Sequence, residues 1–429
     1  MAVQTGAPTA VPADLVPLTT GRPRTGRPAP GALGRCVADP ESFAAEHWGR
    51  SPLLTRGTEN AFRDLLDLDG VDELLSCRGL RTPFIRMAKA GQVLDSSSFT
   101  APGGVGAEIS DQVRDDKVAA LFGDGATVVL QALHRTWPPV IDLCTHLAAE
   151  LGHPVQANAY VTPPSSRGFS AHYDVHDVFV MQLAGRKHWT IHAPVLADPL
   201  RDQPWGQRSR AVAEAAGGPA AIDTVLEPGD VLYLPRGWLH AATALGEVSA
   251  HLTVGVHVVT RYALVEALAA LVADDPELRA TLPLGLDVAD PEALAPHLDA
   301  VRTALATALD RVPAEAVARR VRRRVWTGGR PEPMGVVAGT AFAEGLAVGD
   351  VVRRRVGLHH HLRAAGEQVV LELPDREVAF PAFTEPALRA LLDNGPVAVG
   401  SLAGMEEADQ VVLVRRLLRE GVVVPAGRS

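Results

Sequence analysis

The chain has 429 residues, of which 47% are hydrophobic and 21% charged, and its formal net charge is −9. This is the composition of an ordinary soluble globular protein with room for two or three domains, and the negative charge excludes a nucleic-acid-binding surface over the whole protein. We expect a cytoplasmic protein with no membrane partner, because no apolar run reaches membrane-spanning length, no secretory signal is present, and the three cysteines lack disulfide or zinc spacing.

Four segments follow one another along the chain. Residues 1–30 are rich in Pro, Gly, Thr and Arg without periodicity, which predicts a disordered tail. Residues 31–258 mix helical patterns, short strands and turn clusters, and we expect there a mainly β core with α additions. Residues 259–330 carry apolar side chains at helical spacing, which predicts a helical region. Residues 331–429 form the last unit.

That last unit has the outline of a winged helix. A helix over 386–392, a turn at 395–397, a second helix over 406–420 and a strand at 421–424 are predicted in this order. Residues 331–429 hold ten arginines and thirteen acidic residues, whereas DNA binding requires a basic face that neutralises phosphates. DNA binding is therefore disfavoured, and we expect a structural or protein-contact module.

The most informative residues of the chain are two histidines and an aspartate. His172 and Asp174 form an H-x-D motif in 171-AHYDVHDVFVMQLAGRKHWTIH-192, which we assign to a β-strand because apolar residues alternate just downstream. Alternation would place the imidazole and the carboxylate on the same face. His240 ends the segment 229-GDVLYLPRGWLH-240, where a strand over 231–234 is followed by a Pro-Gly turn.

Two histidines and one carboxylate are the ligand set of non-haem iron(II) oxygenases, which leave the remaining coordination positions open. A lone histidine is more often a hydrogen-bonded core residue, and H-x-D alone is a weak signal. The combination of His172, Asp174 and His240 favours a metal centre, because each of the three supplies a side chain of that ligand type.

Lys187 begins a predicted strand over 187–191, after a tight turn. Alternation places it on one face with Trp189 and Ile191, so its ammonium group would lie among apolar side chains. A buried charge requires a partner, and the distal carboxylate of a dicarboxylate co-substrate would supply one. A lysine that reaches the rim of the barrel, or that pairs with a carboxylate of the protein, is the alternative.

The stretch 157-ANAYVTPPSSRGFSAHYDVHDVFVMQLAGRKHW-189 resembles the JmjC-type ribosomal oxygenases, and 41-ESFAAEHWGRSPLL-54 resembles the first helix and strand of that family. The spacing from Gly229 through Pro235 and Gly237 to His240 is similar to the second cupin signature. The resemblance extends from about residue 30 to the C-terminus, with specific motifs only in 41–54 and 157–255.

The resemblance implies a double-stranded β-helix of the cupin/JmjC type, followed by a helical dimerisation region and a winged-helix domain. It also implies that His172, Asp174 and His240 bind Fe(II) and that Lys187 holds the C5 carboxylate of 2-oxoglutarate. The residues that match the lining of the co-substrate pocket are Asn158, Tyr160 and Thr253. Many relatives carry an acidic residue where Val175-His176 stands here, which leaves the substrate open.

The activity implied by the resemblance is hydroxylation of a protein side chain, with O2 and 2-oxoglutarate as co-substrates and succinate and CO2 as products. A ribosomal protein is the expected substrate and a homodimer the expected assembly. A peptide or a small natural product is an alternative substrate, and the hydroxylated residue stays open between His, Arg and others. A different class of function is a metal-loaded sensor that controls a DNA-binding winged helix.

Two further clusters need an interpretation. His359-His360-His361 could bind a metal, but consecutive residues on a strand point to opposite faces and cannot all bind one ion. The basic run 319-RRVRRR-324, from Arg319 to Arg324, is assigned to a solvated helix face. Contact with ribosomal RNA or with an acidic partner is the alternative for this run.

Overall fold

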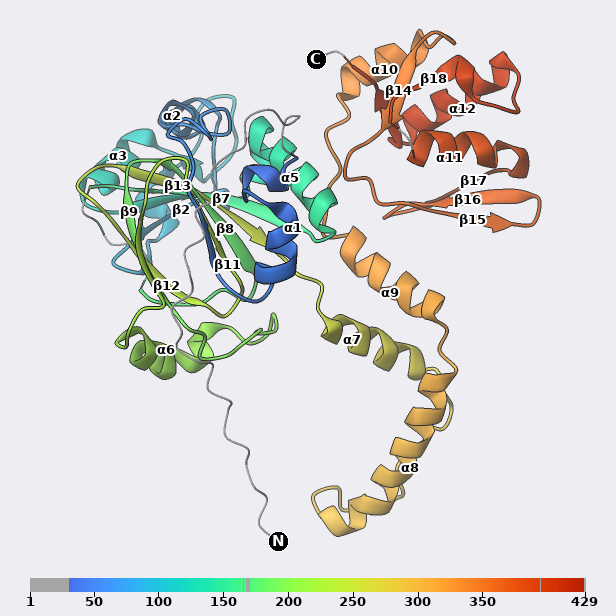
Figure 1. Ribbon diagram of the computed structural model, residues 1–429, viewed down its shortest axis with the longest axis horizontal. Helices are drawn as coiled ribbons and strands as arrows, with labels where there is room; N and C mark the ends of the chain where they lie inside the picture. The colour runs from blue at the N-terminus through green and yellow to red at the C-terminus, as the bar shows by residue number, and fades with distance from the viewer. Residues whose placement is uncertain (1–30, 165, 167–169, 394, 428–429) are drawn as a thin grey trace. The chain divides into compact units, whose positions relative to one another are not determined.

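A computed structural model describes residues 31–164, 166, 170–393 and 395–427. The predicted tail over 1–30 lies outside the described residues. The chain divides into two compact units, one that ends at His257 and one that begins at Val258 (Figure 1). Among the described residues, no helix is long and apolar enough to cross a membrane. The finer predicted division at 330 stays a prediction.

The first unit is built on two facing β-sheets. The larger has the strand order β1-β11-β8-β13-β7-β6-β2-β3, and the smaller has the order β10-β9-β12. The strands are β1 (Leu53–Thr55), β2 (Ile85–Lys89), β3 (Gln92–Val93), β6 (Thr127–Leu130), β7 (Val155–Thr162), β8 (Asp177–Ala184), β9 (Lys187–His192), β10 (Ile222–Leu226), β11 (Val231–Leu234), β12 (Leu239–Ala244) and β13 (Ser249–Val256). A small hairpin, β4 (Thr100–Ala101) and β5 (Gln112–Val113), lies outside these sheets.

Apolar side chains from both sheets meet between them. Val178 and Val180 of β8 pack in one cluster with Trp189 and Ile191 of β9 and with Leu232 of β11. Because alternate residues of a strand share a face, the residues two positions away from these along each strand also face the space between the sheets. The mainly β core with helical additions is therefore confirmed, and its interior is the space between the two sheets.

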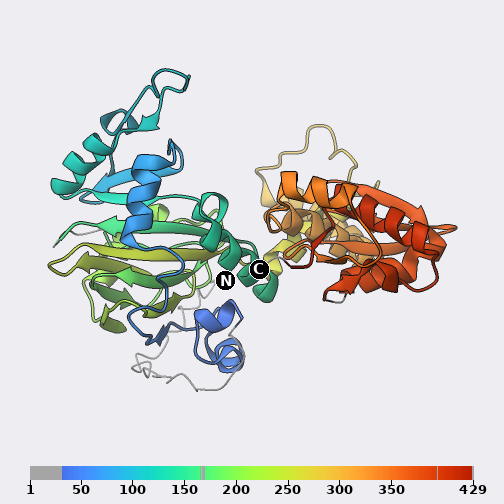
Figure 2. The ribbon, with the colours of Figure 1, turned by 90° about the horizontal axis from the view of Figure 1, so that it is seen from above.

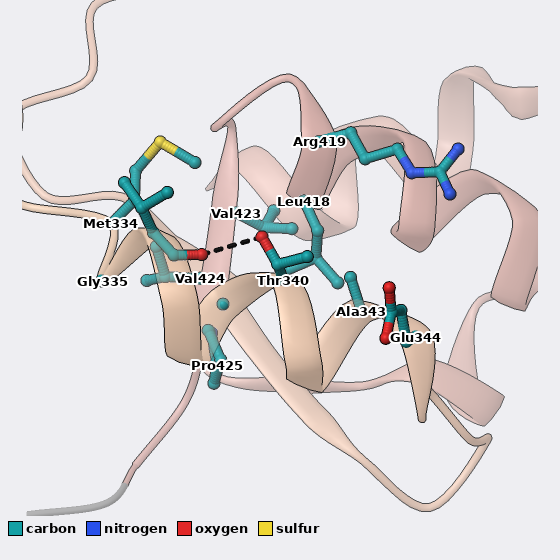
Figure 3. A pocket seen from close by; sticks show the side chains of 12 residues that line it. Met334, Gly335, Thr340, Ala343, Glu344, Leu418, Arg419, Val423, Val424 and Pro425 are labelled. Atoms are coloured by element: carbon teal, nitrogen blue, oxygen red, sulfur yellow. Dashed lines mark hydrogen bonds between the residues drawn. The ribbon is translucent and has the colours of Figure 1, made fainter.

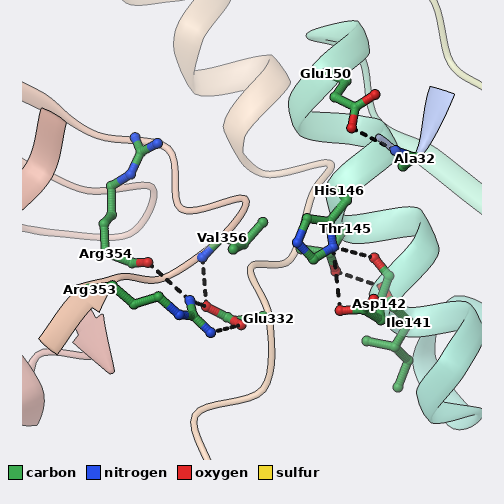
Figure 4. Close-up of polar contacts among 10 residues, drawn as sticks. All are labelled: Ala32, Ile141, Asp142, Thr145, His146, Glu150, Glu332, Arg353, Arg354 and Val356. Atoms are coloured by element: carbon green, nitrogen blue, oxygen red, sulfur yellow. Dashed lines mark hydrogen bonds and ion pairs between the residues drawn. The ribbon is translucent and has the colours of Figure 1, made fainter. Parts of the chain in front are cut away.

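Helices cover the outside of the larger sheet (Figure 2). They are α1 (Pro40–Ser42), α2 (Leu68–Cys77), α3 (Asp115–Gly123), α4 (Leu133–Thr136) and α5 (Pro138–Leu151). Helix α6 (Ser209–Ala216) instead lies beside the smaller sheet, where Val212 packs against Leu239 of β12. Pro138 begins α5, where its missing N–H costs nothing, and Gly152 ends it in the left-handed conformation (φ 70°). Figure 4 shows Glu150 of α5 accepting a hydrogen bond from the Ala32 amide (2.8 Å), which ties the start of the described chain to this helix.

Most of the predicted elements of this unit are confirmed. The strands predicted over 187–191 and 231–234 are β9 and β11. The helix and strand expected within 41–54 are α1 with the π-helical turn Phe43–His47, followed by β1. The assignment of His172 and Asp174 to a strand is wrong, because β8 begins only at Asp177 and His172 makes an isolated bridge with His240.

The second unit begins with the three helices α7 (Arg261–Val272), α8 (Pro291–Asp310) and α9 (Ala314–Trp326). They agree with the helical spacing predicted for this region, but residues 273–290 form no helix. Helix α8 buries only Ala308 among its twenty residues. Some of its apolar side chains therefore face solvent within this chain, and Leu298 and Val301 are 41% and 42% exposed.

The rest of the second unit is a small α/β arrangement with its own core. Its helices are α10 (Val336–Glu344), α11 (Glu385–Asp393) and α12 (Glu407–Arg419), and its strands are β14 (Val351–Arg354), β15 (His361–Ala365), β16 (Gln368–Glu372), β17 (Glu377–Pro381), β18 (Val397–Ala398) and β19 (Val423–Pro425). Both predicted helices and the final strand are present, and β19 pairs with β14 rather than forming a separate hairpin. The sheet β15-β16-β17 was not predicted.

This small arrangement contains a partly buried hydrogen-bond cluster around Glu332 and a separate cavity. Figure 4 shows Glu332 accepting hydrogen bonds from Arg353 of β14 (2.9 Å) and from the Val356 amide (2.7 Å). A cavity of about 300 Å³ lies between α10, the end of α12 and β19, and Figure 3 shows the side chains that line it. The Thr340 hydroxyl donates to the Val336 carbonyl at 2.8 Å within α10, and Glu344 and Arg419 line the cavity together with apolar side chains.

The interpretations of the two clusters are corrected in part. Only His361 lies on a strand, and His359 instead stacks on Trp326 with ring centroids 6.0 Å apart. The basic run lies on α9, but Arg322 is not a solvated residue: it pairs with Glu315, approaches Glu372, and lies over the Trp326 ring. Arg324 pairs with Glu266 of α7, so part of the run is neutralised within the chain.

Candidate functional site

His172, Asp174 and His240 meet at one end of the space between the sheets. His172 and His240 are joined by two backbone hydrogen bonds, from the His240 amide to the His172 carbonyl (2.8 Å) and in the reverse direction (3.2 Å). One ligand atom from each of the three side chains can be chosen so that all three lie within 4.8 Å of one another. Such a cluster can hold one metal ion, and no comparable group of three was found among the described residues.

Hydrogen bonds orient both imidazoles for this role. Nδ1 of His172 lies 2.7 Å from the Ser170 carbonyl, and Nδ1 of His240 lies 3.1 Å from the Trp238 carbonyl. A carbonyl can only accept, so each Nδ1 carries the proton and each Nε2 presents a lone pair. Metal-binding histidines in proteins are held in this way. Nε2 of His240 lies 3.6 Å from the Asp174 carboxylate, which faces the same point.

The charge states also suit a cation. Burial and the neighbouring His172 lower the pKa of His240 to about 4, so its imidazole is neutral at pH 7. Burial acts to raise the pKa of Asp174, but His176, His240 and His172 outweigh it and the pKa lies below its usual range. His240 therefore presents a neutral imidazole and Asp174 a carboxylate, which are the forms that bind a metal.

A second, buried carboxylate fixes the turn that carries His240. Asp177 is fully buried and accepts hydrogen bonds from the Tyr233 hydroxyl (2.6 Å) and the Arg236 amide (3.1 Å). The Arg236 guanidinium lies 3.6 Å from the same carboxylate. The next turn residue, Gly237 (φ 89°), donates its amide to the Asp174 carbonyl at 3.0 Å. The turn is thus tied to the H-x-D segment on both sides.

Replacing Asp177 with alanine is expected to destabilise the protein by about 3 kcal/mol, because the buried Tyr233 hydroxyl and the Arg236 amide both lose their acceptor. Urea unfolding followed by circular dichroism measures this difference. The matched control is Asp223→Ala, since Asp223 is an exposed strand residue paired with His188 at the surface and its removal should cost less than about 1 kcal/mol. Equal losses for the two variants would contradict the structural role of Asp177.

Lys187 is buried inside the barrel without an anionic partner. Its side chain is 2% exposed, and its Nζ donates to the Thr162 hydroxyl at 3.1 Å. No carboxylate lies within ion-pair distance of it in the described part of the chain, and burial lowers its pKa to about 8. Neither alternative from the sequence holds, because the ammonium group neither reaches the rim nor pairs with a carboxylate of the protein.

The three predicted pocket residues lie on the two neighbouring strands β7 and β13. Asn158 and Thr253 are directly opposite each other, and Tyr160 lies one alternation further along β7. The side-chain oxygen of Asn158 accepts a hydrogen bond from the Ala132 amide at 2.9 Å. The Tyr160 ring stacks on His251 with centroids 5.0 Å apart and planes at 3°. All three therefore belong to the interior that holds Lys187.

The sequence interpretation missed His251 and Arg86. His251 lies two residues before Thr253 on β13, so alternation alone could have placed it on the same face. Burial lowers the pKa of His251 well below its usual value, with Lys187 and His240 adding to the effect. Arg86 of β2 forms a hydrogen bond with Tyr160, and its positive charge helps to lower the pKa of Asp174. Nothing in the sequence around Arg86 signals this position.

The interior fits a dicarboxylate next to a metal ion. Nδ1 of His251 and Nε1 of Trp189 are buried without a hydrogen-bond partner in the described part of the chain. Lys187 lies beside them with an unbalanced positive charge. Buried polar groups of this kind are costly unless a ligand completes them. The donors, the ammonium and the three ligand side chains together can hold an anionic chelating molecule on a metal.

Comparison with known proteins finds similarity in the part of the chain that contains His172, Asp174 and His240. A family profile described as the JmjC domain matches residues 136–264. Ribosomal oxygenase 1 of Gallus gallus is 31% identical over 224 residues, which cover 51% of this chain and 35% of that protein. The bifunctional lysine-specific demethylase and histidyl-hydroxylase NO66 of Drosophila persimilis is 30% identical over 255 residues, which cover 57% of this chain and 35% of that protein. The chain thus spans about a third of the length of these relatives.

Solved structures extend the similarity beyond the profile. The ribosomal oxygenase YcfD of Escherichia coli matches with a TM-score of 0.51 and 19% identity, over 90% of this chain and 98% of that protein. A structure of YcfD with cobalt and 2-oxoglutarate matches with a TM-score of 0.50 and 18% identity, over 90% of this chain and 98% of that protein. These likenesses concern the fold. Residues 136–264 therefore match the JmjC domain profile, and the chain has the fold of the ribosomal oxygenase YcfD.

Proposed function

We propose that this chain is an Fe(II)- and 2-oxoglutarate-dependent oxygenase that hydroxylates a side chain of a protein. The observation that carries the proposal is that two oriented imidazoles and a carboxylate meet beside a buried lysine, which has no counter-ion among the residues that the structure describes. An ordinary core would not keep these groups together, because each one costs free energy unless a ligand completes it. The JmjC profile supports the same activity.

In this proposal His172, Asp174 and His240 bind one Fe(II), and Lys187 binds the distal carboxylate of 2-oxoglutarate. Asn158, Tyr160 and Thr253 line the co-substrate pocket. Bound iron supplies the redox chemistry, in which O2 and 2-oxoglutarate yield succinate and CO2 while a substrate C–H bond is hydroxylated. The protein orients the ligands, excludes water with its apolar interior and neutralises the co-substrate charge.

The proposed substrate is a ribosomal protein, and its support is the relation to ribosomal oxygenases. A cytoplasmic location is part of this proposal. A peptide or a small natural product remains the alternative, since Val175-His176 departs from the acidic residue that many relatives carry after the H-x-D motif. The test is anaerobic loading with Fe(II), followed by O2-dependent release of succinate with and without ribosomal proteins. A gain of 16 Da on one of them identifies the substrate, and no succinate release under any condition contradicts the oxygenase.

The affinity for 2-oxoglutarate is expected to fall above pH 8. Lys187 has a pKa of about 8 in the free protein, and a carboxylate binds the ammonium form in preference to the amine. Below pH 8 Lys187 is protonated in most molecules, so the affinity for 2-oxoglutarate changes little. Above pH 8 each further pH unit reduces that affinity about tenfold. Isothermal titration calorimetry between pH 6.5 and 9.5 measures this dependence. Lys187→Met should remove it, and a persistent slope would assign the effect to another group.

We also propose that a second copy of the chain covers the helical region 259–330, as the family resemblance implies. Support comes from its exposed apolar side chains, which include Tyr262 (50%) and Val265 (53%) on α7 and Leu298 on α8. Exposed patches of this kind mark interfaces. Analytical ultracentrifugation should show a dimer that the double variant L298D/V301D converts to a monomer with unchanged circular dichroism. A monomeric unmutated protein would contradict the proposal.

The C-terminal part, residues 331–429, is proposed to be a winged-helix-like domain that contacts protein rather than DNA. Its helix pair α11 and α12 and the strand pair β14 and β19 support the first part. Its net acidic composition supports the second, because few arginines are left to neutralise phosphates. Arg376 and Arg416 are both paired with Glu420. Salt-dependent binding of double-stranded DNA would instead favour the metal-loaded sensor as the function.

A further inference from the structure

A groove of about 690 Å³ lies between the helices α2 and α3 (Figure 1), on the outside of the larger sheet. Its floor is formed by Val128 of β6 and Val161 of β7, which are paired in the sheet. The next residue of β7, Thr162, points to the opposite face, where its hydroxyl accepts a hydrogen bond from Lys187. The groove and the interior that holds Lys187 therefore lie on opposite faces of the same strands, and the groove is a separate site.

Both helices turn an apolar stripe toward the groove. On α2 the stripe consists of Leu68, Val71 and Leu75, which recur at the i, i+3, i+7 spacing of one helix face. On α3 it includes Val118 and Phe122. Leu68 is 39% exposed, and Leu75 and Phe122 are half-buried, so the described part of the chain leaves this apolar surface partly uncovered. A contiguous uncovered apolar surface is the usual sign of a binding site.

The ionisable side chains that line the groove are all carboxylates. They are Asp72 of α2 and Asp115 and Asp116 of α3, and no lysine, arginine or histidine of the described chain lines it. Asp116 is neutralised by Arg114, its partner at 2.9 Å. Asp72 and Asp115 are exposed and form no ion pair with any described residue. The groove thus combines an apolar floor with a negative rim, which complements an apolar segment that carries basic residues on its flanks.

The walls and the floor also decide the form of the partner segment. Two helices bound the groove, and the strands β6 and β7 beneath it are each paired on both sides, so a partner finds no free strand edge to extend. A helix satisfies its own backbone hydrogen bonds and can bind through side chains alone. The lining of α2 runs from Leu68 to Ser76, which is about 12 Å and matches about two helical turns.

We propose that the groove between α2 and α3 binds a partner protein through a helix with an apolar stripe two turns long and with lysine or arginine on both flanks of that stripe. The apolar side chains pack on Val128, Val161 and the stripes of the two walls. The basic side chains pair with Asp72 and Asp115 at the rim. This binding site does not depend on the proposed oxygenase function, because the groove lies outside the barrel interior.

The test measures the binding of synthetic peptides to the full chain by fluorescence anisotropy. The probe is the rhodamine-labelled peptide amide Ala-Lys-Leu-Lys-Ala-Leu-Leu-Gln-Lys-Leu-Lys-Ala-Lys, which as a helix presents its leucines at i, i+3, i+4 and i+7 with lysines on both sides. One counterpart has glutamate in place of every lysine, and another has serine in place of every leucine. The expected result is saturable binding of the probe and at least about tenfold weaker binding of both counterparts.

Two carboxylates of the same helix separate binding in the groove from attraction to the negative protein as a whole. Asp72 lines the groove, whereas Asp69 is exposed on α2 and does not line it. Asp72→Asn should weaken binding of the probe about threefold, and Asp69→Asn should leave it nearly unchanged. Leu75→Gln should weaken binding about tenfold, because it removes apolar contact from the wall of the groove.

Three outcomes would overturn the inference. The first is equal binding of the probe and its serine counterpart, which would indicate general electrostatic attraction. The second is an equal effect of Asp72→Asn and Asp69→Asn, a comparison that holds even where Leu75→Gln lowers stability. The third comes from analytical ultracentrifugation of the same variants: a dimer that is lost in Leu75→Gln, with unchanged circular dichroism, would assign the groove to a second copy of the chain.

Discussion

Replacing His172 with alanine is expected to reduce O2-dependent succinate release by at least about 100-fold, since even the loss of a group that only orients a metal ligand can cost that much. The substitution removes one of three ligand atoms that lie within 4.8 Å of one another. The remaining aspartate and histidine cannot hold Fe(II) firmly, so both metal content and turnover should fall. Metal content is measured by atomic emission on protein loaded anaerobically, and turnover by succinate release.

The control for this prediction is another histidine of the same unit. His146 lies on α5, where its Nδ1 lies 2.9 Å from the Asp142 carbonyl and its side chain is 42% exposed (Figure 4). His146→Ala should retain iron and turnover within about twofold, because surface changes of this kind have small effects. Normal iron content in the His172 variant would show that the metal binds elsewhere and would sink the assignment of the three ligands.

Replacing Lys187 with methionine is expected to weaken 2-oxoglutarate binding about 100-fold, which corresponds to about 2.7 kcal/mol. Among the described residues the ammonium has only the Thr162 hydroxyl as a partner, at 3.1 Å, so its charge is available to the co-substrate. A buried charge-assisted hydrogen bond is worth this much because the surroundings do not screen it. Calorimetric titration of the Fe(II)-free protein loaded with Zn(II) measures the affinity without turnover.

The same substitution should not destabilise the protein. Folding buries an ammonium without a counter-ion, which costs free energy, and methionine has a similar length without the charge. The melting temperature without ligand should therefore be equal or higher, and the stabilisation by 2-oxoglutarate should disappear. Lys117→Met is the matched control, since Lys117 is a surface lysine on α3 that donates to the Thr100 carbonyl at 2.8 Å. Weakened binding in both variants alike would contradict a specific role for Lys187.

Much of the fold was accessible from local patterns. The alternation after Asp174 and around Lys187 predicted β8 and β9, and the Pro-Gly chemistry at 235–237 predicted the turn before β12. These predictions succeeded because strand alternation and turn geometry depend on neighbouring residues. The strand assignment for His172 failed for the opposite reason. Its extended backbone is held by a bridge to His240, which is distant in the sequence.

In the second unit, too, elements that depend on local spacing were predicted and contacts between distant segments were not. Helical spacing predicted α7, α8 and α9, since a helix is stabilised within its own segment. The sheet β15-β16-β17 was missed, and its ion pairs between Arg363 and both Glu372 and Glu377 join three strands. The arginines of 319–324 were assigned to solvent because their partners, Glu266 and Glu372, lie far away in the sequence.

The sequence by itself determined the ligand types of the site, the face that Lys187 shares with Trp189, and the family that the chain resembles. Each of these depends on residues a few positions apart. Only the tertiary structure decided that no carboxylate of the described chain neutralises Lys187 and that His251 joins the pocket. Burial and charge pairing depend on which distant segments the fold brings together, and local spacing carries no record of that.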